Sequence, residues 1–509
     1  MRTKNSLRNV LVGIIAQLLM VTIGFVSRRV FIDTLGNEML GINGLFLSII
    51  SMLSLTELGI GVAIICNLYK PLADNDEIKI TALIQFFKKT YRIIVLIILC
   101  LGIILMPFLK NFLKEEINNI FLLIVFSLFL VDCAIPYFFA HKRSLIFADQ
   151  KNYLITMVSS SSNILNSILQ IVILIITKNY ILYLSIKIII RLLENIIISM
   201  IADKKYPFIK NDNKPILEKQ TKDNIISNTK ALSLHYVGNY LINGVDNIII
   251  SKFLGIVIVG FYSNYYLIIT TLITFLSQFS TGILASFGNM VNKESREKSL
   301  GIFKKADFIN FVIYNFSAIS LLCLFNPFIT LWINPDSLFS IPVVIMLSLN
   351  FYITGIAGVL GSIRASAGIF KPDRYVHLLM AVLNLIVSIS LVQIIGIIGV
   401  FIGTLLCLLI KEISILPSIV YQNIFKISVK EYYKKLVTYC LTTVFAASIT
   451  MYVCTFIITQ GGWLFFLLRC GVCVIIPNII IIILFRKTEE FIYMKTMIKN
   501  LITKRKILF

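Results

Sequence analysis

Lys and Arg alternate in density along this 509-residue chain, in step with about fourteen long apolar segments. Every second connection between segments is crowded with these cations, as are both ends of the chain, and the intervening connections hold few. If each segment crosses a membrane, most of the 47 Lys and Arg fall on one side. Positively charged loops remain on the cytoplasmic side of membrane proteins. The pattern therefore predicts a multi-pass membrane protein with both termini in the cytoplasm.

The apolar segments are long enough to cross a bilayer as helices. Hydrophobic residues make up 58% of the chain and charged residues 14%, whereas a soluble domain is roughly 45–50% apolar and about 25% charged. The segments lack the two-residue alternation of a spanning strand, so we expect an all-α integral membrane protein. The expected spans are 7–27, 40–66, 93–109, 117–139, 153–176, 180–201, 225–250, 256–288, 307–331, 341–363, 376–394, 397–420, 436–458 and 463–485.

The net charge of +22 lies mainly in loops that flank the predicted spans. Cations in such loops orient a membrane protein and attract anionic lipids, so we expect membrane lipids as partners and no nucleic acid. The connections are too short to hold a soluble catalytic domain, and the chain has no phosphate-binding GKS or GKT motif. We therefore expect neither an enzyme nor a cofactor.

A duplication is visible in the sequence. Leu35-Gly36 followed by Leu40-Gly41 is matched 219 residues later by Leu254-Gly255 followed by Val259-Gly260. Each pair opens the second span of a half. Because each copy has an even number of spans, six, both copies have the same orientation and are related by a pseudo-two-fold axis along the membrane normal. Transporters are often built from such parallel repeats.

The duplication divides the chain into five parts. We predict an N-terminal six-helix lobe at 1–201, a cytoplasmic linker at 202–224 and a C-terminal six-helix lobe at 225–420. Two further helices follow at 436–485, and a basic cytoplasmic tail occupies 486–509.

Polar residues recur at helical spacing in two spans of each half. Polar groups are costly in hydrocarbon, so their positions indicate which helix faces avoid lipid. One interpretation is a central polar cleft that binds substrate, and the other is close packing of helix against helix. The residues predicted to line the cleft are Gln17, Arg28, Arg29, Asn43, Glu57, Asn228, His235, Asn239, Asn243, Asp246, Asn264, Gln278 and Arg364.

Several of these residues allow two interpretations. Arg28 and Arg29 lie at the predicted outer end of the first span, where they either extend to the interface or bind a phosphate through the guanidinium donors. Arg364 either anchors the inner end of its span or binds an anion from that side. His235 shares a helix face with Asp246 and could belong to a proton path.

Other charged and sulfur-containing residues lie within the spans. Lys187, Arg191 and Glu194 share one helix face, so we expect either an intramembrane charge network or an anion site. Lys411 and Glu412 are adjacent on a helix and should not face each other, so we expect each to pair elsewhere. The nine Cys should pack as small apolar side chains, and we predict no metal site.

The sequence SRRVFIDTLGNEMLGI at Ser27–Ile42 is followed by Glu57-Leu-Gly-Ile-Gly61 and Tyr69-Lys-Pro-Leu-Ala73. Together these motifs resemble the start of bacterial polysaccharide flippases of the Wzx type. Those flippases belong to the multidrug/oligosaccharidyl-lipid/polysaccharide (MOP) exporter superfamily, which includes the MATE transporters. The resemblance implies a MATE-like fold of two six-helix lobes with two additional C-terminal helices. It also implies that Arg28, and less directly Arg29, supplies positive charge to the lumen.

The resemblance further implies a function in the bacterial plasma membrane. Such a protein would translocate an undecaprenyl-pyrophosphate-linked oligosaccharide from the inner to the outer leaflet by alternating access, for cell-surface polysaccharide synthesis. Protons, Na⁺ or the membrane potential would drive the cycle, and glycosyltransferases or a polymerase of the same pathway would be partners. The alternatives are a MATE-like drug or cation exporter, which would need a more acidic lumen, and a membrane-embedded glycan polymerase or transferase, which would need a large loop or domain.

Overall fold

In a computed structural model the described part of the chain consists of helices joined by short non-helical connections and contains no strand. The chain divides into two compact units, residues 1–263 and 264–509, and each is described by itself. The residues that the structure describes are 2–57, 60–210, 217–219, 221–223, 225–226, 244–291, 295–369, 372 and 375–506.

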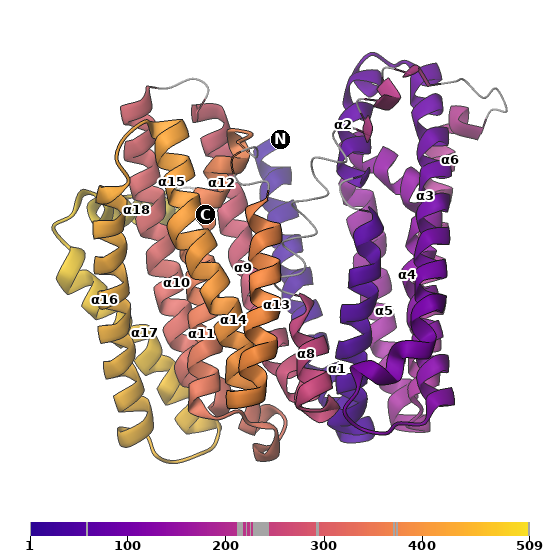
Figure 1. Ribbon diagram of the computed structural model, residues 1–509. Coiled ribbons are helices and arrows are strands. Elements are labelled where there is room, and N and C mark those ends of the chain that lie inside the picture. Colours follow the sequence, from indigo (N-terminus) through magenta and orange to yellow (C-terminus); the bar gives the residue numbers. More distant parts are fainter. Residues whose placement is uncertain are drawn as a thin grey trace. The chain divides into compact units, whose positions relative to one another are not determined.

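The first unit is a bundle of long helices with short turns between them (Figure 1). Its helices, including short 3₁₀ turns (η), are α1 (Arg2–Leu53), η1 (Ser54–Glu57), α2 (Ile60–Ala73), α3 (Glu77–Leu105), η2 (Met106–Phe112), α4 (Asn119–Ala148), α5 (Asn152–Thr177), α6 (Tyr180–Lys205), η3 (Pro207–Lys210) and α8 (Asp246–Phe253). Helix α9 (Ile256–Val291) begins in this unit and ends in the second.

The second unit is also a helical bundle, and in three places its helices widen into π-helical turns (η5, η6 and η7). Its helices are α10 (Arg296–Trp332), η4 (Pro335–Ser337), α11 (Ile341–Ile356), α12 (Gly358–Ser366), α13 (Val376–Ile395), α14 (Ile397–Leu408), η5 (Leu409–Ile415), α15 (Leu416–Val420), η6 (Tyr421–Phe425), α16 (Lys430–Tyr452), η7 (Val453–Ile457), α17 (Trp463–Phe485) and α18 (Glu489–Lys506).

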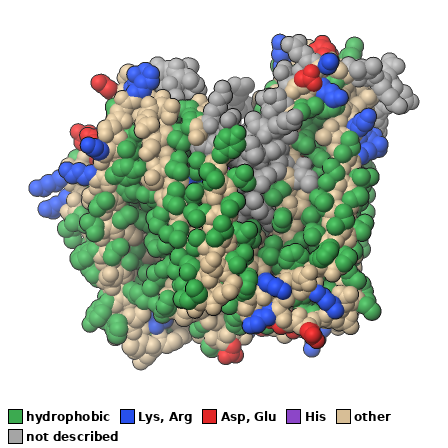
Figure 2. Space-filling model, viewed as in Figure 1, with side chains coloured by type: hydrophobic (Ala, Val, Ile, Leu, Met, Phe, Trp, Pro, Cys, Tyr) green, Lys and Arg blue, Asp and Glu red, His purple; other side chains and the backbone are tan. Residues whose placement is uncertain are grey.

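Eleven helical segments of the described chain are long and apolar enough to cross a membrane. Hydrophobic side chains cover much of the visible helix flanks, and many Lys and Arg lie toward the helix ends (Figure 2). Large apolar side chains such as Ile176 and Ile394 are 75% and 76% exposed, which suits contact with lipid rather than water. The predicted all-α, multi-pass membrane fold is confirmed.

The repeated glycines occupy matching backbone positions. Gly36 and Gly255 have φ values of +79° and +112°, in the region that glycine enters without the steric penalty of other residues. At Gly36 the backbone leaves helical geometry, and α1 therefore consists of two helical stretches joined by a kink. The kink separates the first predicted span from the second.

The two copies also make one contact twice. The backbones approach so closely that a Cβ on Gly41 would overlap the carbonyl of Ile256, and a Cβ on Gly260 would overlap the carbonyl of Asn37. Gly260 and Ile256 stand 219 residues after Gly41 and Asn37, so the contact is reciprocal. All four residues belong to the first unit. The duplicated motif thus has a structural role, because only glycine allows this close approach.

Lys411 and Glu412 correct one sequence expectation. The two adjacent side chains form an ion pair with 2.9 Å between Nζ and Oε1, and each keeps 14% side-chain exposure. The expectation that each would pair elsewhere assumed a regular α-helix. Both residues lie in the π-helical segment η5, where the wider turn changes the angle between successive side chains.

Candidate functional site: a charged cavity in the first unit

A cavity of about 430 Å³ lies among α1, η1, α4 and α6. Its volume falls within the range of pockets that hold small molecules, roughly 300–1,000 Å³. Polar and charged groups form a large part of its surface. The lining residues are Leu47, Ile50, Ser51, Ser54, Glu57, Phe129, Asp132, Cys133, Pro136, Tyr137, Ala140, Arg143, Lys187 and Arg191.

Asn118 and Asn179 are the N-caps at which α4 and α6 begin. The Asn118 side chain accepts a hydrogen bond from the N–H of Ile120 at 2.9 Å, and the Asn179 side chain accepts one from Ile181 at 2.9 Å. Each cap satisfies amide groups that would otherwise lack a partner at the helix start. Asp132 and Arg191 stand 14 and 12 positions beyond their caps. At 1.5 Å per residue, they lie roughly 20 Å along their helices. In a hydrocarbon core about 30 Å thick that begins at the caps, they would lie roughly two thirds of the way across.

Asp132 of α4 is the centre of the charged lining. Its Oδ2 lies 3.0 Å from Nζ of Lys187, and its Oδ1 lies 2.9 Å from Nε of Arg191. The Asp132 side chain is 11% exposed. One carboxylate of α4 therefore pairs with two cations that lie on successive turns of α6. This pairing offsets much of the free-energy cost of placing the two cations in the membrane.

A second group of charges lies further toward the end of α4. Nη1 of Arg143 lies 3.4 Å from Oε1 of Glu194, and Nη2 donates to the hydroxyl of Ser159 at 3.0 Å. Ser159 in turn donates to Glu194 at 2.5 Å. The predicted residues therefore fall into two charge groups. Lys187 and Arg191 pair with Asp132 between α6 and α4, and Glu194 contacts Arg143 of α4 and Ser159 of α5.

Glu57 lies at the end of η1 and faces the same cavity. The hydroxyl of Tyr91 donates to its Oε1 at 3.4 Å. Within the described part of the chain Glu57 makes no ion pair, in contrast to Asp132. The cavity thus combines ion-paired cations with a carboxyl group whose neighbours are phenols.

The two arginines at the end of the first span have different environments. Arg29 forms an ion pair with Asp33, one turn further along α1, with 2.7 Å between Nε and Oδ2. Arg28 is partly buried near Tyr183 of α6. Its Nη1 is shielded from solvent and has no hydrogen-bond partner among the described residues. Arg28 therefore retains donor capacity that an anionic ligand could use.

The remaining predicted cleft residues are dispersed over both units. Asn43 accepts a hydrogen bond from the Tyr180 hydroxyl at 3.4 Å, and Asp246 is buried in the first turn of α8. Asn264 and Arg364 are buried in the second unit, on α9 and α12.

Gln17 is partly exposed on α1. Asn228, His235, Asn239 and Asn243 lie outside the described residues, as does the side chain of Gln278. Of the predicted cleft residues that the structure describes, only Glu57 lines the same cavity as Lys187 and Arg191. The central cleft stays a prediction.

Sequence reasoning missed two members of the charged cavity, Asp132 and Arg143. Asp132 stands in the apolar sequence FLVDCAIP, and a carboxylate inside a predicted span is the same signal that identified Lys187 and Arg191. Arg143 follows His141 and Lys142 near the predicted cytoplasmic end of α4, where a cation is ordinary. The sequence could therefore have revealed Asp132 but gave no distinct signal for Arg143.

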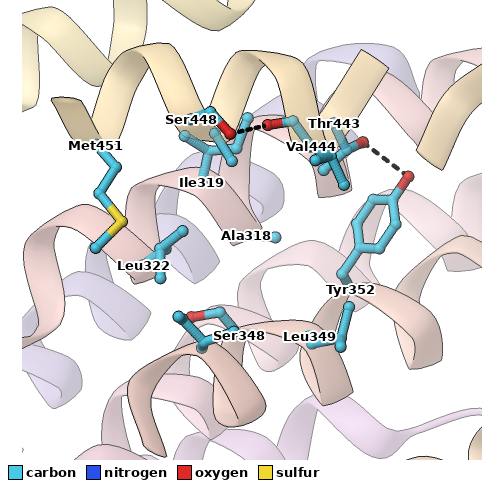
Figure 3. A pocket seen from close by; sticks show the side chains of 12 residues that line it. Ala318, Ile319, Leu322, Ser348, Leu349, Tyr352, Thr443, Val444, Ser448 and Met451 are labelled. Atoms are coloured by element: carbon cyan, nitrogen blue, oxygen red, sulfur yellow. Dashed lines mark hydrogen bonds between the residues drawn. The ribbon is translucent and has the colours of Figure 1, made fainter. Parts of the chain in front are cut away.

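The second unit contains a cavity of opposite character. It measures about 310 Å³, lies among α10, α11 and α16, and is lined mainly by apolar side chains (Figure 3). The Thr443 hydroxyl donates to the Tyr352 hydroxyl at 2.9 Å, and Ser448 donates to the backbone carbonyl of Val444 at 2.9 Å. These hydroxyls are thus already paired, whereas Ser348 Oγ, which also lines the cavity, has no hydrogen-bond partner among the described residues. The cavity therefore offers a polar ligand few groups to bind. The charged cavity of the first unit is the stronger candidate site.

Comparisons with known proteins identify the family. Residues 6–285, more than half of the chain, match the model of a family described as polysaccharide biosynthesis protein. The chain belongs to this family. A search of curated proteins found no match.

Solved structures share the fold at low sequence identity. Lipid II flippase MurJ in an inward closed conformation matches with a TM-score of 0.65 and 16% identity, over 94% of this chain and 99% of the other. An inward-facing multidrug resistance MATE family transporter of the MOP superfamily matches at 0.60 and 15%, over 78% and 96%. The MATE transporter VcmN of Vibrio cholerae matches at 0.55 and 14%, over 84% and 100%.

These likenesses show the fold, and the family match carries the link to polysaccharide synthesis. Together they confirm the resemblance seen in the sequence, a polysaccharide biosynthesis protein with a MOP-type exporter fold. The structural neighbours are flippases and transporters rather than enzymes.

Proposed function

We propose that this protein is a flippase for an undecaprenyl-pyrophosphate-linked oligosaccharide. It would carry the lipid-linked glycan from the inner to the outer leaflet of the bacterial plasma membrane, by alternating access, for cell-surface polysaccharide synthesis. The observation that carries the proposal is the charged cavity, which lies among membrane-spanning helices of a polysaccharide biosynthesis protein.

The chemistry of the cavity suits a sugar better than a small ion. Sugar hydroxyls both donate and accept hydrogen bonds, and bonds to charged groups are the stronger ones. The lining offers two carboxylates, Glu57 and Asp132, together with the cations Arg143, Lys187 and Arg191. Because these charges are largely balanced, the cavity can solvate a polar glycan without trapping one charged group. The polyprenyl tail would remain in the lipid.

Arg28 is the residue that we propose binds the pyrophosphate. A planar guanidinium can donate two parallel hydrogen bonds to phosphate oxygens. Arg28 has a shielded nitrogen without a partner, whereas Arg29 is already paired with Asp33. The other predicted cleft residues would meet the glycan during the transport cycle.

The orientation, the energy source and the partners belong to the same proposal. The positive loops favour cytoplasmic termini, and protons, Na⁺ or the membrane potential would drive the cycle. Glycosyltransferases or a polymerase of the pathway would supply and consume the lipid-linked glycan. A MATE-like drug or cation exporter is the rival, because the same fold serves multidrug transporters.

The test is the leaflet location of lipid-linked glycan in cells with and without the protein. A glycan-modifying enzyme that cannot cross the membrane is added from outside, and modified and unmodified lipid-linked glycan are measured. We expect the glycan to accumulate unmodified in cells that lack the protein. Arg28→Ala should reproduce that accumulation at normal protein abundance, and the matched variant Arg29→Ala should not.

Two results would contradict the proposal. If lipid-linked glycan is modified equally with and without the protein, the protein does not move it. If loss of the protein instead causes retention of organic cations and leaves the glycan unaffected, the exporter alternative is correct.

Collapse of the proton gradient, the Na⁺ gradient or the membrane potential, one at a time, identifies the energy source in the same assay.

A further inference from the structure

Three cysteines from three helices of the second unit meet in its interior. Cys323 belongs to α10, Cys454 to the π-helical segment η7 at the end of α16, and Cys473 to α17. Their sulfur atoms all lie within 4.8 Å of one another. The residues are 7%, 3% and 1% exposed. Residues 131 and 19 positions apart in sequence are thus brought to one point.

The surroundings of this cluster are apolar and closed. Ile319, Ala446 and Ile480 pack with the three cysteines in one buried cluster. Apolar packing alone does not require sulfur at all three positions, since Ala or Val would fill such a space as well. Three sulfur atoms that face one another instead form a set of soft metal ligands. The apolar residues around them exclude water.

Arg469 of α17 places a cation beside the cluster. Its Nε donates to the carbonyl of Cys454 at 3.2 Å, and its Nη2 donates to the carbonyls of Ile458 at 2.6 Å and Gln460 at 3.2 Å. These bonds fix the segment that carries Cys454. Cys454 also lies within a π-helical turn, a feature found frequently at functional sites.

We propose that Cys323, Cys454 and Cys473 form a binding site for a monovalent copper ion. Thiolate ligands favour Cu(I), Zn²⁺ and iron–sulfur clusters. Structural Zn²⁺ takes four ligands in almost every case, whereas this site offers three sulfurs in an apolar shell. A trigonal set of three sulfurs suits Cu(I).

The charges balance without any change of oxidation state. On binding one Cu(I), two of the three thiols lose their protons to solvent, and the third sulfur binds as a thiol. Two thiolates and one monovalent cation leave one negative charge, and the guanidinium of Arg469 neutralises it. The bound ion would tie α16 and α17, the two C-terminal spans, to α10.

The test is Cu(I) binding by the full-length protein in detergent under anaerobic, reducing conditions. The protein competes with bicinchoninate, a coloured Cu(I) chelator, and the metal content is measured by mass spectrometry. We expect one Cu(I) per chain, bound at least tenfold more weakly in Cys323→Ser, Cys454→Ser and Cys473→Ser. The matched controls Cys440→Ser on α16 and Cys470→Ser on α17 should bind as the wild type does.

A second measurement does not depend on whether the variants fold. Adding one equivalent of Cu(I) to the metal-free wild type should raise its melting temperature, since a ligand that binds only the folded state stabilises it.

Any of three results would overturn the proposal. One is Cu(I) uptake by the wild type that is no stronger than uptake by the triple Cys→Ser variant. Another is equal loss of binding in Cys470→Ser and Cys473→Ser. The third is one equivalent of tightly bound Zn²⁺ with no Cu(I).

Discussion

Replacement of Asp132 by Asn should leave two membrane-embedded cations without a counter-charge. Breaking a buried ion pair by removing one partner costs about 3–5 kcal/mol, and an exposed pair contributes about 0–1 kcal/mol. The Asp132 side chain is 11% exposed, but those of Lys187 and Arg191 retain 23% and 37%. The environment is therefore intermediate, and we expect Asp132→Asn to reduce the free energy of unfolding by about 2–3 kcal/mol.

A triple variant separates structural from functional importance. Replacing all three charges with apolar residues of similar size removes the desolvation cost together with the attraction, and such exchanges are often neutral or stabilising. We expect Asp132→Leu/Lys187→Met/Arg191→Met to regain at least the wild-type free energy of unfolding. The same variant should lose glycan translocation, because the cavity then lacks the charges that we propose meet the sugar.

The assay pairs unfolding in mixed micelles, followed by circular dichroism, with the external glycan-modification assay in cells. The charge-preserving variant Asp132→Glu is the control for side-chain size. The reasoning fails if Asp132→Asn changes stability by less than about 0.5 kcal/mol, the range of ordinary surface substitutions. It also fails if the triple variant is as unstable as Asp132→Asn, or if it is stable and still translocates glycan.

Two further predictions concern backbone packing and pH. Gly41→Ala should destabilise the first unit by about 1–3 kcal/mol through overpacking, because the added Cβ would overlap a backbone carbonyl of α9. Gly24→Ala is the control, because the space around Gly24 is open. It should be neutral or stabilising in the same unfolding assay. Burial raises the pKa of Asp149, but hydrogen bonds from Lys151 and Tyr206 outweigh it and leave the pKa below its ordinary value. The stabilisation from Asp149 is therefore present above its unfolded-state pKa and is lost as the pH falls through the folded-state pKa. Asp149→Asn should make the free energy of unfolding less dependent on pH in the acidic range. It should leave that free energy unchanged only at the lowest pH.

The fold was predictable from the sequence because its signals are local. A run of about 20 apolar residues identifies a span wherever it occurs, and the alternation of Lys and Arg orders the spans across the membrane. The Gly36 and Gly255 motifs likewise marked a duplication that reappears as matching positive φ values. None of these inferences needed knowledge of which helices are neighbours.

The candidate site was only partly predictable because it depends on contacts between helices. Charge within an apolar span identified Lys187 and Arg191 as unusual. Nothing in the sequence indicates that their partner is Asp132, which stands more than fifty residues earlier. The Lys411–Glu412 pair was misjudged for a different reason. The widening of the helix into a π-turn at η5 has no simple sequence signature.

The duplication also bears on why the charge network exists. At the 219-residue offset of the glycines, the counterparts of Asp132, Lys187 and Arg191 are apolar: Phe351, Leu406 and Ile410. The second half of the chain therefore lacks these charges at these positions. If the network were a requirement of the fold, both copies would need it. The second copy carries a different charge pair, Lys411–Glu412, directly after the counterpart of Arg191. The arrangement of two cations around Asp132 is therefore not repeated, which favours a role in transport, and the stable but inactive triple variant is the result that this argument requires.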